Sequence, residues 1–140
     1  MNAIIFSAFW GILMMLSGAF IKQKTVPGVM AVVGIILLLV VNGYELFTGI
    51  PFSLTFLEVL FAATLLYFLL SGKDVAKVGE HVAEYFALIF FVLCGVTLSC
   101  TYNTLLMLFL GIEIMSIPLY VLTGSDKLNL KSNEAALKYF

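Results

Sequence analysis

The chain has 140 residues, of which 63% are hydrophobic and only 11% are charged, and its formal net charge is −1. Soluble domains are nearer half apolar and a quarter charged, so a chain of this composition has too little polar surface to stay dissolved. The nearly neutral charge gives no reason to expect a nucleic-acid partner. The composition therefore predicts an integral membrane protein.

Five apolar runs follow one another, and each is long enough, or nearly so, to cross a bilayer as a helix of about 20 residues. They cover roughly residues 3–21, 26–48, 54–70, 82–101 and 104–123. None shows the alternating polarity of a membrane β-strand. We therefore expect an all-α, polytopic integral membrane fold, a helix bundle with five transmembrane helices.

Small residues recur at four-residue spacing in two of the runs. Ala3, Ser7 and Gly11 do so in the first run, and Gly95 and Ser99 do so in the fourth. This spacing suits close contact between helices. A very short turn separates the fourth run from the fifth, so these two should form a tight antiparallel hairpin.

The two cysteines, Cys94 and Cys100, lie six residues apart within an apolar run. They form neither a CxxC pair nor a spacing typical of metal ligands. We expect free, buried thiols and no metal site.

The lysines indicate the orientation in the membrane. If the five spans alternate in direction, six lysines fall on one side: Lys22, Lys24, Lys73, Lys77, Lys127 and Lys131. The other side has none, and lysine-rich loops remain in the cytoplasm. The N-terminus is therefore expected outside.

Residues 132–140, "SNEAALKYF", look like the start of a sixth helix. Ser132 or Asn133 can cap it, and Glu134 in its first turn suits the helix dipole. The remaining residues are far too few to cross a bilayer. We therefore expect residues 1–140 to be the N-terminal part of a longer bundle.

One carboxyl group stands in the middle of the fifth run, in "LFLGIEIMSIPLYVL". Glu113 is the tenth residue of this run, close to the membrane midplane. A charge there costs about 2.5–3.5 kcal/mol on insertion scales, so the group must stay protonated or find a partner. Glu113 is our candidate for proton translocation. The alternative is a carboxyl that only hydrogen-bonds to a neighbouring helix.

The residues around this carboxyl extend the candidate site. Ser116 and Tyr120 follow at i+3 and i+7, so they share its helix face as a possible polar pathway. Pro118 has no N–H, which frees the carbonyl of Ile114 and predicts a helix kink.

The remaining charged residues give less specific indications of function. Lys138 follows Glu134 by four residues, which suits an ordinary surface ion pair and, alternatively, a proton relay. Glu45, Glu58 and Glu84 lie near the ends of their spans, where we expect them to reach the membrane interface.

The segment from Glu84 to Phe140, through "GIEIMSIPLYVL" and "EAALKYF", resembles the subunit N family of proton-pumping NADH:quinone oxidoreductase, respiratory complex I. The resemblance implies a single antiporter-like helix bundle with its N-terminus outside. It places Glu113 in the proton pathway and makes Lys138 a functional position. It also implies a multi-pass protein of the bacterial inner membrane.

The same resemblance implies a translocase subunit that is not catalytic by itself and binds no cofactor. NADH, flavin, iron–sulfur clusters and quinone would belong to partner subunits. Other membrane subunits, lipid and the further helices of its own chain would surround it. Two alternatives remain: a subunit of a multi-subunit sodium/proton antiporter, and a structural or assembly membrane protein.

Overall fold

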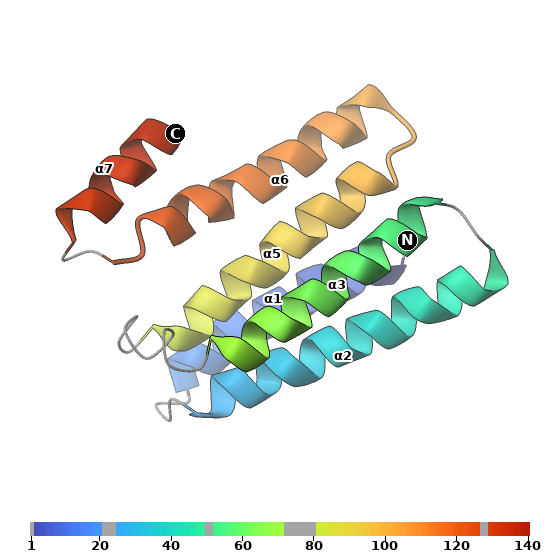
Figure 1. The fold of residues 1–140 in the computed structure, drawn as a ribbon, viewed down its shortest axis with the longest axis horizontal. Coiled ribbons are helices and arrows are strands. Elements are labelled where there is room, and N and C mark those ends of the chain that lie inside the picture. The colour runs from blue at the N-terminus through green and yellow to red at the C-terminus, as the bar shows by residue number, and fades with distance from the viewer. Residues whose placement is uncertain (1, 21–24, 50–51, 72–80, 127–128) are drawn as a thin grey trace.

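The computed structural model describes residues 2–20, 25–49, 52–71, 81–126 and 129–140, and these residues are all-helical (Figure 1). The helices are α1 (Asn2–Phe20), α2 (Thr25–Thr48), α3 (Phe52–Leu70), α5 (Val82–Cys100), α6 (Leu105–Thr123) and α7 (Leu130–Tyr139). All except α7 are long and apolar enough to span a membrane, so the five predicted spans are confirmed.

The long helices lie side by side and alternate in direction (Figure 1). Helices α1, α2, α3 and α5 form one group, α6 lies along α5, and α7 folds back beside α6. The start of α1, the end of α2 and the start of α6 consequently lie at the same end of the bundle.

The core lies around α5. Its fully buried apolar side chains come from several helices: Met14, Ile35, Leu38, Leu57, Phe61 and Phe90. Half of the span of α5, 50%, is buried inside the chain, whereas only 11% of α6 is buried. Helix α6 is therefore peripheral, and most of its apolar surface faces outward.

The small residues of α1 form its contact with α5. Ala3, Ser7 and Gly11 are all buried, and a Cβ added to Gly11 would lie 3.2 Å from the ring of Phe91. The predicted packing role of this four-residue repeat is confirmed, because larger side chains would hold the two helices apart.

Helices α5 and α6 touch along what we call the glycine seam, formed by Gly95, Ser99 and Gly111. A Cβ added to Gly95 would lie 2.5 Å from the backbone nitrogen of Met115 and 2.7 Å from the carbonyl oxygen of Gly111. A Cβ on Gly111 would lie 2.9 Å from the nitrogen of Ser99. The two backbones are thus in direct contact, which confirms the tight hairpin.

Helix α7 begins earlier than its sequence suggested. Asn129 is the N-cap, and its side chain accepts a hydrogen bond from the backbone nitrogen of Lys131 at 3.0 Å. The prediction that Ser132 or Asn133 caps this helix is therefore wrong. Ser132 Oγ instead donates to the carbonyl oxygen of Thr123 at 2.6 Å and fastens α7 to the end of α6. Glu134 consequently lies in the second turn.

Candidate functional site

Helix α6 carries Glu113 near its middle. The helix begins after Thr104, whose side chain caps it by accepting a hydrogen bond from the nitrogen of Met107 at 3.2 Å. Glu113 is eight residues beyond Leu105, which corresponds to about 12 Å at the helical rise. The predicted mid-span position of this carboxyl is confirmed.

Glu113 points away from the rest of the described chain. Gly111 and Pro118 are the buried residues of α6, whereas Glu113 and its neighbour Ile112 are exposed. Within the described residues, the Glu113 side chain makes no hydrogen bond or ion pair. Glu113 is exposed in this segment because α6 packs on α5 through its opposite face.

The two predicted polar neighbours make other contacts. Ser116 Oγ donates to the backbone carbonyl of Glu113 at 3.1 Å rather than to its carboxylate. The ring of Tyr120 packs edge-on against Tyr139 and Phe140, with centroids 5.2 and 5.4 Å away. Tyr120 thus joins α6 to α7, and a polar pathway through these two residues remains a prediction.

Pro118 lies within α6 and is buried. The helix continues through it from Leu105 to Thr123, although the proline leaves the carbonyl of Ile114 without its usual donor. The kink remains a prediction, and the carbonyl that lacks the Pro118 donor lies one residue from Glu113.

Lys138 binds a residue of its own helix. Its Nζ lies 2.5 Å from Glu134 Oε1, and the two side chains are 75% and 63% exposed. The predicted i,i+4 pair is confirmed. The described structure does not bring Lys138 to Glu113, and the functional role of each residue stays a prediction.

Sequence reasoning missed a polar contact between α2 and α3. Asn42 Nδ2 donates to Glu58 Oε2 at 2.7 Å and to the carbonyl oxygen of Leu54 at 3.1 Å. Asn42 is fully buried. The half-buried Glu58 therefore has a partner on α2, and its expected reach to the membrane interface remains a prediction.

The sequence does contain a signal for this pair. Asn42 stands six residues before the end of α2, and Glu58 stands six residues after the start of α3. Two polar residues at equal depth on consecutive antiparallel spans can meet.

The other two acids lie near helix ends as expected. Glu45 Oε1 accepts a hydrogen bond from the backbone nitrogen of Asn2 at 3.3 Å. Glu84, in the first turn of α5, is exposed and lies 3.3 Å from His81 Nδ1.

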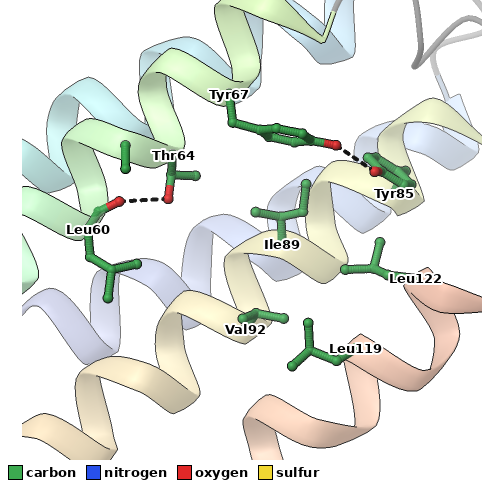
Figure 2. A pocket seen from close by; sticks show the side chains of 9 residues that line it. Leu60, Thr64, Tyr67, Tyr85, Ile89, Val92, Leu119 and Leu122 are labelled. Carbon is green, nitrogen blue, oxygen red and sulfur yellow. Dashed lines mark hydrogen bonds between the residues drawn. The ribbon is translucent and has the colours of Figure 1, made fainter. Parts of the chain in front are cut away.

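A pocket of about 360 Å³ opens between α3, α5 and α6 (Figure 2). The hydroxyls of Tyr67 and Tyr85 meet at 2.7 Å at one end of it, and Thr64 Oγ1 donates to the carbonyl of Leu60 at 2.9 Å. The other lining residues are aliphatic, and none of the lining residues is a carboxylate, lysine or histidine. The polar groups of this pocket are therefore the hydroxyls of Tyr67, Tyr85 and Thr64.

Both cysteines are free thiols, with Cys94 buried and Cys100 half-buried. Across the described ranges, no three His, Cys, Asp or Glu residues gather as a metal site would require.

Five of the lysines that set the expected orientation lie outside the described residues: Lys22, Lys24, Lys73, Lys77 and Lys127. The orientation therefore remains a prediction.

Comparison with known proteins places the segment around Glu113 in a family. Residues 103–140 match the family described as "NADH:quinone oxidoreductase/Mrp antiporter, TM". NADH-quinone oxidoreductase subunit N of Flavobacterium psychrophilum is 31% identical over 100% of this chain, and that of Cytophaga hutchinsonii is 34% identical over 100% of it. The resemblance to subunit N is confirmed.

A third relative, subunit N of Flavobacterium johnsoniae, is 35% identical over 78% of this chain. The chain spans 26% of that relative's length and 33% of the length of the other two. With its five apolar helices, the chain is a multi-pass membrane protein, and its residues 103–140 match an antiporter-like family.

Proposed function

We propose that this chain is part of a proton-translocating membrane subunit of an NADH:quinone oxidoreductase, with Glu113 as a proton-carrying group. Residues 1–140 would form the N-terminal part of a longer helix bundle, inserted in the bacterial inner membrane with its N-terminus outside. Redox chemistry with NADH, flavin, iron–sulfur clusters and quinone would take place in partner subunits.

The observation that supports this proposal is the outward position of Glu113 in the middle of α6. A carboxylate facing lipid at this depth costs several kcal/mol, so its face must meet a polar partner or water supplied from beyond the described helices. A carboxyl that exchanges such partners can take up and release a proton, as intramembrane acids in proton relays do. The similarity to subunit N relatives supports the same role.

Lys138 has a secondary role in this proposal. Its ion pair with Glu134 stands at the end of α7, within the segment that matches the family. Because both side chains are largely exposed, Lys138 can leave Glu134 for another carboxylate at little cost. We assign Lys138 a proton-relay position at the end of the bundle where α6 ends.

The test is NADH-driven proton pumping in membrane vesicles carrying Glu113→Gln in the full-length gene. NADH oxidation by an artificial electron acceptor reports separately whether the peripheral part of the complex is assembled. Glu84→Gln is the control, since it removes an exposed carboxylate at the start of α5, away from Glu113. We expect Glu113→Gln to lose most pumping with oxidation intact and Glu84→Gln to retain pumping.

Glutamine preserves hydrogen bonding but cannot ionise, so the outcome separates the proton role from packing. Normal pumping by Glu113→Gln, with only Glu113→Leu defective, would assign Glu113 to helix packing and reject the proposal. It would favour a structural or assembly protein.

The family description also names Mrp antiporters, so a sodium/proton antiporter subunit is the second candidate. Sodium-dependent proton exchange in vesicles supplied with neither NADH nor quinone would favour this candidate. Exchange that requires NADH oxidation would favour the oxidoreductase.

A further inference from the structure

The contact between Asn42 and Glu58 lies apart from Glu113 and is not used by the proposed function. The Asn42 amide is fully buried, and its nitrogen donates to both Glu58 Oε2 and the carbonyl of Leu54. Both N–H groups of this amide are therefore satisfied.

The oxygen of the same amide has no hydrogen-bond partner among the described residues, although it is buried. Exchanging the amide oxygen and nitrogen does not resolve this, because the oxygen would then face two acceptors, Glu58 Oε2 and the Leu54 carbonyl. A buried, unpaired polar atom is costly and needs a donor. The Glu58 carboxylate cannot supply one.

The second carboxylate oxygen, Glu58 Oε1, lies beside Gly43. A Cβ added to Gly43 would lie 3.7 Å from Glu58 Oε1, at ordinary van der Waals distance, so a side chain placed there would stand directly beside this oxygen. A water molecule donates two hydrogen bonds and is held where several polar groups converge. The amide oxygen and the free carboxylate oxygen are two such groups.

The position of the pair indicates how water can reach it. Asn42 lies six residues before the end of α2, and Glu58 lies six residues after the start of α3. At the helical rise, both are about 9 Å from the end of the bundle where α2 stops. Gly43, which carries no side chain to close the gap, is half-buried next to them.

We propose that Asn42 and Glu58 form a hydrated polar site between α2 and α3. Its ligand is water, which donates to Asn42 Oδ1 and Glu58 Oε1 and is continuous with the aqueous phase at the end of α2. Gly43 keeps the passage open, and the carboxylate holds the water in place.

The test is the reactivity of a thiol placed in this passage. Thiolates, which form in water and not in lipid, attack the sulfur of methanethiosulfonate reagents to form a disulfide and release methanesulfinate. Gly43→Cys is introduced into the full-length protein after its native cysteines are replaced by alanine, and membrane vesicles are treated with a cationic, membrane-impermeant methanethiosulfonate. The matched control is Val59→Cys, next to Glu58 in sequence but 66% exposed on the outside of the bundle.

We expect Gly43→Cys to react at least about tenfold faster than Val59→Cys, because only the former thiol would meet water and ionise. Equally slow reaction of the two, with both thiols reactive after denaturation, would show a dry contact and overturn the proposal. Equally fast reaction of the two thiols would also overturn the proposal. Water would then reach the outside of the bundle as well as the passage at this depth, and no enclosed site would exist.

A second comparison tests the role of the carboxylate. In the Gly43→Cys background, Glu58→Gln keeps an acceptor for water and should preserve fast labelling, whereas Glu58→Leu removes the acceptor and should slow it. Unchanged labelling with Glu58→Leu would show that the water does not depend on Glu58. The comparison of Gly43→Cys with Val59→Cys stands even if the leucine variant does not fold.

Discussion

Replacing Gly95 by alanine tests the glycine seam directly. The new methyl group would lie 2.5 Å from the backbone nitrogen of Met115, whereas ordinary contact begins at 3.4 Å. Helices α5 and α6 would have to separate by about 0.9 Å along this direction, because the three nearest atoms all belong to the backbone and no side-chain rotation relieves the clash. Overpacking of this kind costs about 1–3 kcal/mol.

Alanine also favours the helix over glycine by up to about 1 kcal/mol, which offsets part of that cost. We therefore expect Gly95→Ala to lower the free energy of unfolding by up to about 2 kcal/mol, and by about 1–3 kcal/mol relative to a glycine-to-alanine change in a helix that meets no clash. The assay is equilibrium unfolding of the full-length protein in mixed micelles, followed by circular dichroism.

Gly28→Ala is the control, because a Cβ at Gly28 in α2 would have no neighbour within 4 Å. It should be neutral or slightly stabilising, since only the gain in helix propensity applies. If Gly95→Ala is as stable as Gly28→Ala, the backbones of α5 and α6 are not in contact and the reasoning fails.

Three further predictions concern contacts between helices. Asn42→Leu should destabilise the protein by about 1–3 kcal/mol in the same unfolding assay, because it leaves a half-buried carboxylate unpaired; unchanged stability would contradict this. Tyr120→Leu removes two edge-on ring pairs, each worth about 0.5–1.5 kcal/mol, so hydrogen exchange in residues 130–140 should accelerate. Asn129→Ala should accelerate it too, by loss of a cap worth about 0.5–2 kcal/mol, and unchanged protection in either variant would count against these contacts.

The sequence predicted the spans well because a bilayer imposes one simple requirement, a long apolar helix. The largest error at the start of a membrane span was two residues, at α3, which begins at Phe52. The hairpin of α5 and α6 followed from its short turn, and the glycine seam followed from the spacing of small residues. These features depend on residues that are close together in the sequence, so they can be recognised without knowledge of the tertiary structure.

Contacts between distant side chains were less accessible. Asn42 was overlooked because its importance depends on the side chain that it meets, 16 residues further along. The start of α7 was misplaced because Ser132 and Asn133, three and four residues after the actual cap Asn129, are also capping residue types, and packing on α6 engages Ser132 elsewhere. The position of Glu113 was predicted, but the direction in which it faces depends on which side of α6 packs on α5.

The glycine seam has a consequence for how this scaffold can diversify. One face of α6 is fixed by backbone contact with α5 and tolerates almost no change, while the opposite face carries Glu113 and makes no demand on the five-helix core. Substitutions around the carboxyl can therefore accumulate without repacking the described helices. The same supporting helices can present one acid to different partners, so what meets this face can change while the fold beneath it stays the same.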